Sequence, residues 1–251
     1  MRLTGKICLI VGASSGMGRR TALRAGAEGA HVIAAARRTA DCEAVAQAIQ
    51  EGGGAAEALS LDGTDPASVE TALDKVDAAH GRLDCVFNNL GATFGHSRVH
   101  ETPLERWAET IATNLTAVFQ LMRKELPLLM KAGGGVIVNN SSSAGLRGVR
   151  NMSDYSAAKW GLIGLTRSAA LEYGDEGVRV NAIAPGIIAT EKFDDFKAQM
   201  PDLFEDLRKG IPGGRFGEMD DIANLVTWLM SDEAKYVSGA TFPIDAGQTA
   251  G

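Results

Sequence analysis

The stretch "KICLIVGASSGMG", from Lys6 to Gly18, joins a short apolar run to a glycine-rich turn. A continuously apolar run of this length is typical of a strand that is buried on both faces of a parallel sheet. The turn carries glycines at positions Gly12, Gly16 and Gly18, and a helical pattern follows it. Glycines let the backbone approach a phosphate group closely, and the first turn of a helix offers it N–H donors. We therefore predict a strand, turn and helix that bind a nucleotide, with hydroxyl donors from Ser14 and Ser15.

Short apolar runs recur along the chain and alternate with segments that have helical spacing. The predicted strands lie at residues 6–11, 31–36, 56–61, 83–88, 135–140, 178–183 and 240–245. The clearest helical segments are residues 65–81 and 103–133. In the first of these, Asp65 suits an N-cap, Pro66 suits the first helical position, and Gly81 suits a stop. The alternation predicts one α/β domain over residues 1–251, a doubly wound parallel sheet with helices on both faces and ligands at its carboxyl edge.

Composition and charge exclude several classes of function. The chain has 25 Lys and Arg residues against 31 Asp and Glu residues, and the basic residues form no run. No nucleic-acid partner is therefore predicted. No apolar stretch reaches the length of a signal peptide core or a membrane span, and the three cysteines show no C-x-x-C spacing. We therefore expect a cytoplasmic chain with reduced thiols and no membrane partner. No histidine or cysteine cluster has metal-ligand spacing, so no metal is predicted.

The second predicted strand ends in "AAARR", where Ala36 is followed by Arg37 and Arg38. In dinucleotide-binding folds this strand end carries Asp or Glu when the adenosine ribose has free hydroxyls. An alanine followed by two guanidinium groups suits a ribose 2′-phosphate instead. We therefore predict that NADP(H) is preferred and that NAD(H) stays possible. The alternative is a solvated pair of arginines at the start of a helix.

Tyr155 and Lys159 stand four residues apart in "SDYSAAKWGLIGLT". On a helix such a pair lies on one face, with side chains about 5–6 Å apart, and a nearby cation lowers the pKa of a phenol. Ser142 ends a predicted strand, where its hydroxyl can hold a carbonyl or hydroxyl oxygen. Asn114 lies within a helical segment, which its propensity disfavours. It can order a water near the lysine, or it can satisfy buried backbone groups; both interpretations stay open.

Taken together, these motifs resemble the short-chain dehydrogenase/reductase family, in the form usually called the classical type. The resemblance runs from Lys6 to about Gly247, and the motifs stand in the family's order and spacing. They are the glycine turn, "NNLG" from Asn88, Asn114, Ser142, Tyr155-x-x-x-Lys159 and "APGIIAT" around Pro185. The resemblance implies a Rossmann-type sheet of seven parallel strands in the order 3-2-1-4-5-6-7, and often a homotetramer.

The resemblance also implies a role for each matching catalytic residue. Tyr155 would be the general acid/base, and Lys159 would lower its pKa and bind the nicotinamide ribose. Ser142 would orient the reacting oxygen, and Asn114 would hold a water of a proton relay. A neighbouring ammonium and a nicotinamide cation have the sign that is needed to bring the phenol's pKa toward neutrality.

A larger set of residues is implied to bind the cofactor. Its members are Gly12, Ser14, Ser15, Gly16, Met17, Gly18, Arg37, Arg38, Asp62, Gly63, Asn89, Gly91, Tyr155, Lys159, Pro185, Gly186, Ile188 and Thr190. Asp62 should lie near the adenine, with Asn89 and Gly91 beside the adenosine. Ile188 and Thr190 should meet the nicotinamide carboxamide.

The chain departs from the family's pattern at a few positions. Leu90 replaces the usual alanine of "NNAG", and Gly63 stands where a β-branched residue is common. Val11 precedes the glycine turn in place of threonine, and Ala246 replaces a glycine near the C-terminus. None of these changes removes a catalytic group, but Leu90 raises the question whether the cofactor cleft is reshaped.

One segment, Glu191 to Phe216, interrupts the alternation of strands and helices. Its apolar residues recur at helical spacing among acidic ones, as in an amphipathic helix. Because it enters on the carboxyl side of the sheet, we expect a substrate lid over 191–216. The alternative is a surface helix that packs on the body of the domain.

The sequence as a whole predicts an NADP(H)-dependent oxidoreductase that interconverts a ketone and a secondary alcohol by hydride transfer. The expected partner is a small-molecule carbonyl or alcohol substrate, with a homotetramer as the assembly. An NAD-dependent alcohol dehydrogenase of the same family is the first alternative, against which Ala36 and Arg37 argue. A non-catalytic nucleotide-sensing protein is the second, and the complete set of Tyr155, Lys159 and Ser142 argues against it.

Overall fold

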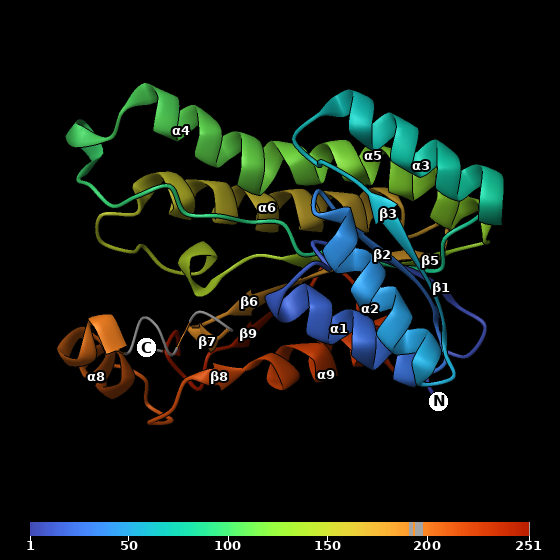
Figure 1. The fold of residues 1–251 in the computed structure, drawn as a ribbon. Helices are drawn as coiled ribbons and strands as arrows, with labels where there is room; N and C mark the ends of the chain where they lie inside the picture. The colour runs from blue at the N-terminus through green and yellow to red at the C-terminus, as the bar shows by residue number, and fades with distance from the viewer. Residues whose placement is uncertain (191–192, 194–197, 251) are drawn as a thin grey trace.

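A computed structural model, which describes residues 1–190, 193 and 198–250, shows a parallel sheet of seven strands (Figure 1). Its strands are β1 (Ile7–Val11), β2 (His31–Ala36), β3 (Ala55–Ser60), β4 (Cys85–Asn88), β5 (Gly135–Asn140), β6 (Val178–Pro185) and β9 (Thr241–Ile244). The spatial order is β3-β2-β1-β4-β5-β6-β9. This confirms the predicted fold class and the predicted strand order.

The strand order reverses at the centre of the sheet, between β1 and β4. Val11, the last residue of β1, pairs with Ala35 of β2 on one side and with Asn88 of β4 on the other. In an open parallel sheet a crevice forms at such a reversal, just beyond the carboxyl ends of the strands. The topology therefore places a ligand cleft next to the glycine turn that follows Val11.

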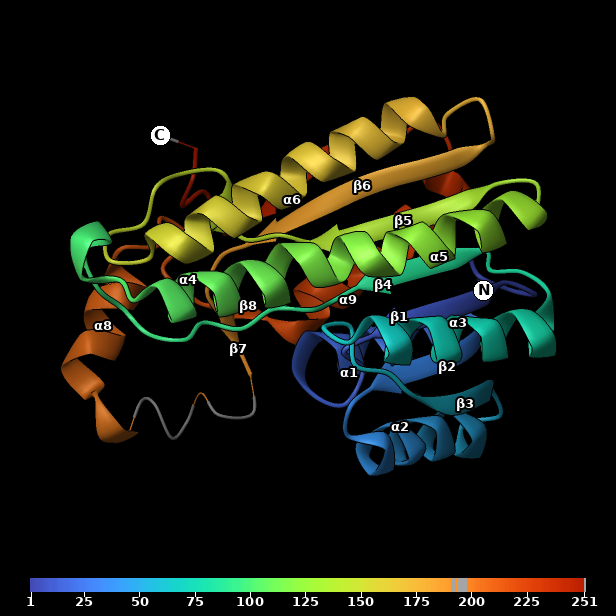
Figure 2. The same cartoon turned by 90° about the horizontal axis from the view of Figure 1, so that it is seen from above.

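Helices cover both faces of the sheet in two layers (Figures 1 and 2). They are α1 (Gly16–Ala27), α2 (Thr39–Glu51), α3 (Pro66–His80), α4 (Leu104–Ile111), α5 (Ala117–Lys131), α6 (Ser153–Glu172) and α9 (Met219–Met230), whereas α8 (Pro201–Lys209) lies at one end of the molecule, away from the sheet. Buried residues of α1, α2 and α9 form one apolar core with the sheet, and those of α3, α5 and α6 form the other. Strands buried on both faces explain why the apolar runs in the sequence are continuous.

The helix signals of residues 65–81 are confirmed. The Asp65 side chain accepts a hydrogen bond from the backbone N–H of Ala67 at 3.0 Å, and Pro66 begins α3. Gly81 ends the helix with a φ of 69°, in the left-handed region that glycine adopts without steric cost. Short-range capping chemistry is therefore readable in this part of the chain.

The predicted helix over residues 103–133 is not one regular α-helix. A π-helical turn, Ala112–Thr116, separates α4 from α5, and Asn114 lies within it. A π-turn inserts an extra residue into the helical ladder and often occurs at functional sites. The interruption explains how the chain tolerates an asparagine there.

A second, two-stranded parallel sheet joins β7 (Ile188–Ala189) to β8 (Gly217–Glu218). Neither strand is predicted from the sequence, because two residues carry no readable periodicity. The pair brackets the segment that contains α8. Within the described ranges, no helix is long and apolar enough to cross a membrane.

Candidate active site

A cleft of about 1490 Å³ opens at the carboxyl edge of the sheet, where the topology predicts one. Its walls include the glycine turn, the end of β2, the residues after β3 and β4, and one face of α6. Most of the predicted cofactor residues line it: Gly12, Ser14, Ser15, Gly16, Met17, Arg37, Arg38, Asp62, Gly63, Asn89, Gly91, Tyr155, Lys159, Ile188 and Thr190. Gly18, Pro185, Gly186, Asn114 and Ser142 lie behind or beside this wall rather than in it.

The glycines of the turn are required by close packing. A Cβ atom on Gly12 would collide with the backbone oxygen of Asn89, and Gly12 has a φ of 79°. A Cβ atom on Gly18 would collide with the backbone oxygen of Gly12. The turn is therefore folded against the residue that follows β4, and the N-terminus of α1 faces the cleft. The N–H groups in the first turn of a helix suit a pyrophosphate.

Arg38 is hydrogen-bonded to the glycine turn. Its Nη2 donates hydrogen bonds to the hydroxyls of Ser14 at 3.0 Å and Ser15 at 2.9 Å, and its Nε lies 3.2 Å from a carboxylate oxygen of Asp41. Both serine O–H groups stay available to donate into the cleft. Arg38 thus orders the glycine turn, which the sequence alone did not indicate.

Arg37 lines the cleft beside Ala36 and keeps its guanidinium without a protein hydrogen bond or ion pair in the described part of the chain. Burial raises the pKa of Asp62, but hydrogen bonds from Thr64 and the charge of Arg37 together lower it below its usual value. A planar guanidinium without a partner, and no carboxylate at the end of β2, fit a ribose 2′-phosphate. The donors at this end of the cleft therefore fit a phosphorylated dinucleotide.

Gly63 and Leu90, two of the departures from the family's pattern, complement each other. A Cβ atom on Gly63 would lie only 2.6 Å from Cδ1 of Leu90. Leu90 therefore fills the space that a β-branched side chain at position 63 would need. In this chain the side chain at position 90, rather than one at position 63, fills this part of the cleft wall.

Tyr155 and Lys159 lie together on α6 at the inner end of the cleft. The Ser142 side chain lies close enough to the Tyr155 hydroxyl to lower the pKa of the phenol, and Lys159 Nζ lies 5.7 Å from the centre of the phenol ring. Ser142 follows β5, so a strand end and a helix face bring the two hydroxyls together. Two hydroxyls and an amine beside one cleft can hold an oxygen and transfer a proton to it.

Lys159 is held by two backbone carbonyls. Its Nζ donates to the oxygen of Asn140 at 2.8 Å and to that of Leu90 at 3.2 Å, and the residue is only 1% exposed. Asn140 also donates from its side-chain amide to Asn89 Oδ1 at 2.8 Å. Asn140 therefore connects the lysine to the adenosine side of the cleft. Sequence reasoning missed it, although it is the last residue of a predicted strand.

The predicted effect of Lys159 on the tyrosine is not produced by the protein groups alone. Burial raises the pKa of Tyr155 above its usual range, and the hydrogen bond with Ser142 opposes this increase only in part. Burial also lowers the pKa of Lys159 to about 7, so the lysine carries only part of its positive charge near neutrality. The lowering of the tyrosine pKa stays a prediction that needs the positive charge of an oxidised nicotinamide ring.

Asn114 is buried and fully engaged with backbone groups. Its Nδ2 donates to the carbonyls of Ala92 and Thr110, both at 2.9 Å, and its Oδ1 accepts from Ala92 N–H at 3.2 Å. A Cβ atom on Gly91 would lie 3.0 Å from Asn114 Oδ1 and 3.1 Å from Lys159 Nζ, so both groups border the same glycine. The geometry favours the interpretation that Asn114 satisfies backbone groups, and the relay water stays a prediction.

A buried polar network lies beneath this site and escaped sequence reasoning. Asn88 Nδ2 donates to Glu125 Oε2 at 3.0 Å and to Asn139 Oδ1 at 3.2 Å, and all three residues are fully buried. Burial raises the pKa of Glu125 to about 8, so this carboxyl is protonated at neutral pH. The network joins α5 to the ends of β4 and β5, just below the residues that line the cleft.

The segment predicted to be a lid is described in part of its range. Residues 191, 192 and 194–197 lie outside the described residues. The rings of Phe193, Phe204 and Phe216 pack on one another, with centroids 4.6–5.2 Å apart. Among the described residues of 191–216, Leu207 of α8 lines the cleft. The aromatic residues therefore stabilise the segment itself, and α8 borders the cleft through one leucine.

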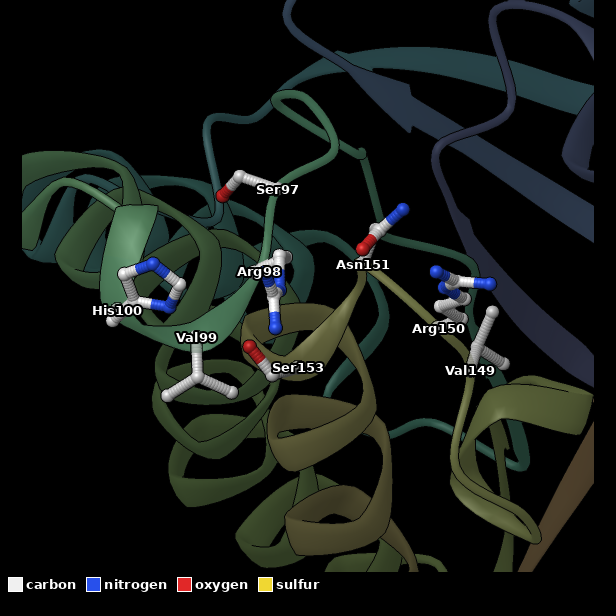
Figure 3. A pocket seen from close by; sticks show the side chains of 8 residues that line it. All are labelled: Ser97, Arg98, Val99, His100, Val149, Arg150, Asn151 and Ser153. Carbon is white, nitrogen blue, oxygen red and sulfur yellow. The ribbon is translucent and has the colours of Figure 1, made fainter.

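A smaller hollow of about 460 Å³ lies between residues 97–100 and 149–153 (Figure 3). Arg98 and Arg150 line it, and both are exposed. The hollow ends at Ser153, the first residue of α6, two positions before Tyr155. Exposed arginines of this kind are usually solvated, and no role follows for them from the geometry.

Comparison with known proteins identifies the family. Residues 12–249 match the family model described as enoyl-(acyl carrier protein) reductase. A cyclohexanol dehydrogenase of Acinetobacter sp. (strain SE19) is 37% identical over 99% of this chain and 96% of its own length. The chain belongs to the short-chain dehydrogenase/reductase family.

Two other short-chain dehydrogenases/reductases extend the comparison. A levodione reductase of Leifsonia aquatica is 38% identical over 99% of this chain and 96% of its own length. A solved Beutenbergia cavernae structure, with NADP bound at low occupancy, has a TM-score of 0.92 and 34% identity, covering 99% of this chain and 98% of that one. As a member of the short-chain dehydrogenase/reductase family, the protein is an NAD(P)-dependent oxidoreductase.

Proposed function

We propose that the protein is an NADP(H)-dependent oxidoreductase that interconverts a ketone and a secondary alcohol, with Tyr155 as general acid/base. The observation that carries the proposal is the close approach of Ser142 and Lys159 to the phenol of Tyr155, which lines one end of a cleft whose other end holds Arg37. One end of the cleft suits proton transfer to an oxygen. The other end suits a phosphorylated adenosine.

The proposed reaction divides the work between cofactor and protein. Bound NADPH supplies the hydride that reaches the carbonyl carbon of the ketone. The Tyr155 hydroxyl gives its proton to the carbonyl oxygen, and Ser142 donates a hydrogen bond to the same oxygen and holds it in place. In the reverse direction the Tyr155 phenolate takes the proton of the alcohol, so atoms and charges balance in both directions.

Lys159 has two functions in this proposal. Two of its donor positions are used by the carbonyls of Leu90 and Asn140, which fix Nζ beside the cleft. The third N–H of the ammonium form is available to a ribose hydroxyl. Its positive charge also favours the phenolate form of Tyr155.

The substrate class is proposed from the activities of two relatives. Cyclohexanol dehydrogenase and levodione reductase both act, by name, on carbon bearing a hydroxyl or a carbonyl. A panel of small ketones, including cyclohexanone, should therefore oxidise NADPH in the presence of this protein. If no ketone in the panel supported turnover while NADPH still bound, the proposed reaction would be wrong.

Cofactor preference is the most direct test of the proposed role of Arg37 at the other end of the cleft. A hydrogen bond to a charged group contributes roughly 1.5–3 kcal/mol, so one arginine on the 2′-phosphate favours NADP(H) by roughly 10- to 150-fold. We expect kcat/KM to be at least about tenfold higher with NADPH than with NADH, and more so at low salt because exposed ion pairs are screened.

The double change Ala36→Asp with Arg37→Ala should reverse this preference. It removes the attraction to the phosphate and adds an acceptor for the ribose hydroxyls. Measuring kcat/KM with both cofactors on the wild type and the double variant decides the matter. A wild type that prefers NADH would show that Arg37 does not reach the ribose.

A further inference from the structure

Two histidines and a glutamate meet at the amino edge of the sheet, at the opposite end of β2 from the cofactor cleft. His31 is the first residue of β2, Glu57 lies on β3, and His80 is the last residue of α3. Glu57 Oε1 lies 2.5 Å from His80 Nε2 and 3.5 Å from His31 Nε2, and the three ligand atoms all lie within 4.8 Å of one another. The two imidazole rings meet edge to face, with centroids 4.9 Å apart.

Three elements, β2, β3 and α3, place these side chains next to one another. Glu57 pairs with Ile33, two residues after His31, so His31 and Glu57 project from the same face of the sheet. Ile33 belongs to the core that α3 covers, which identifies that face. On α3, His80 continues the buried stripe of Val69, Leu73 and Val76 at spacings of four, three and four residues. The helix therefore brings its last inward-facing residue onto the two strands.

The cluster contains a buried nitrogen that lacks a partner. Among the residues that the structure describes, His31 Nε2 has no hydrogen-bond partner, although it is shielded from solvent and lies beside Glu57 Oε1. A buried polar atom without a partner is uncommon and requires an explanation. Glu57 Oε1 lies 3.5 Å away and is also contacted by His80, but it makes no hydrogen bond with this nitrogen. A group that accepts electron pairs from all three side chains would satisfy it.

We propose that His31, Glu57 and His80 form a binding site for Zn²⁺, with solvent as the fourth ligand. Two imidazoles and one carboxylate are a known ligand set for this ion, whereas Ca²⁺ and Mg²⁺ prefer all-oxygen sites. Tetrahedral bonds of about 2.0–2.1 Å place neighbouring ligand atoms roughly 3.3 Å apart. The 3.5 Å distance between Glu57 Oε1 and His31 Nε2 already fits this value. The shorter distance from Glu57 Oε1 to His80 Nε2 increases if the Glu57 side chain, which is 45% exposed on an edge strand, rotates outward.

The absence of a metal motif in the sequence does not argue against this site. The prediction of no metal rests on local spacing, and residues 31, 57 and 80 come from three separate elements. A metal ion here would join the C-terminal end of α3 to β2 and β3. Because the cofactor cleft lies at the other end of these strands, the ion should stabilise the fold rather than take part in the reaction.

Zinc titration of the intact protein tests the proposal. The protein is first treated with a chelator and dialysed, and binding is then measured by isothermal titration calorimetry at neutral pH. We expect one Zn²⁺ per chain, with a dissociation constant on the order of 1 μM or below, and a Zn²⁺-dependent rise in Tm. Saturating Mg²⁺ should produce neither effect.

The four histidines of the chain provide matched variants. His31→Gln, His80→Gln and Glu57→Gln should each weaken Zn²⁺ binding by at least about tenfold and abolish the Tm rise, in line with the loss of one ligand. His96 and His100 lie in exposed positions of another loop, so the pair His96→Gln with His100→Gln should bind Zn²⁺ like the wild type.

Two results would overturn the proposal. The first is weak, unsaturable binding by the wild type. The second is unchanged affinity in both His31→Gln and Glu57→Gln. Because Glu57 is exposed, its variant should fold even if one of the histidine variants does not, which keeps the comparison decisive.

Discussion

At the scale of single residues, Leu90 and Gly63 are a complementary pair. Gly63→Val places methyl groups where Leu90 Cδ1 lies, and Leu90 is a wall of the cofactor cleft. Overpacking of this kind typically costs about 1–3 kcal/mol. We therefore expect Gly63→Val to lower the free energy of unfolding by that amount and to weaken NADPH binding, because the leucine is pushed into the cleft.

A double-mutant cycle separates this pair from independent effects. Leu90→Ala alone should also destabilise the protein, because it leaves a gap beside Gly63. Combined with Gly63→Val, it should be less destabilising than the sum of the single changes, with a coupling of about 0.5–3 kcal/mol in urea unfolding. Additive costs would mean that the two residues do not share the space.

Other residue-scale features could be read from the sequence only in part. The spacing of Tyr155 and Lys159 placed both side chains correctly on one helix face. The protonation of Lys159 could not be read, because it depends on burial beneath Leu90 and Asn140. The raised pKa of Glu125 could not be predicted for the same reason, because nothing in a helical pattern marks an acid that faces the core.

At the scale of elements, the seven strands of the main sheet were predictable from short apolar runs, although the edge strand β3 keeps exposed residues such as Glu57. The π-turn around Asn114 was not predictable, because its cause lies in a distant segment, the backbone of Ala92. The short strands β7 and β8 were missed because their pairing depends on the path of the chain around α8.

The lid is a proposal at this same scale. Helix α8 has no buried residue and meets the cleft through Leu207, so little apolar area fixes it to the body of the domain. We expect the backbone amides of 198–210 to exchange hydrogen fastest in the free enzyme and to gain protection with NADPH and a ketone bound. Hydrogen exchange with and without these ligands is the measurement. Equal protection in both conditions would support a surface helix instead of a lid.

At the scale of the whole molecule, large apolar side chains are exposed on the layer of α4, α5 and α6. Leu104 and Trp107 on α4, Phe119 on α5, and Trp160 and Leu171 on α6 are between 43% and 87% exposed. Exposed apolar residues that gather on one layer often mark a protein–protein interface. This supports the proposal that the enzyme is a homotetramer, as the family resemblance implies.

Light scattering coupled to size-exclusion chromatography tests this assembly. The wild type should elute as a species of four chains of 26.3 kDa each. Trp160→Glu should yield smaller species, because it places a charge in the proposed interface. Ala48→Glu, on the exposed side of α2, is the matched control and should leave the mass unchanged. A wild type that is monomeric at micromolar concentration would contradict the proposal.

The central claim is that Tyr155 transfers the proton in an NADPH-dependent reduction, and Tyr155→Phe tests it most directly. The change removes one hydroxyl and leaves Lys159 and the phosphate-binding turn in place. We predict that kcat falls by at least about 10²-fold, while the Kd for NADPH stays within a few-fold of the wild type. Tyr173→Phe, outside the cleft, is the matched control and should retain full turnover. Near wild-type kcat in Tyr155→Phe, on a ketone that the wild type reduces well, would contradict the account.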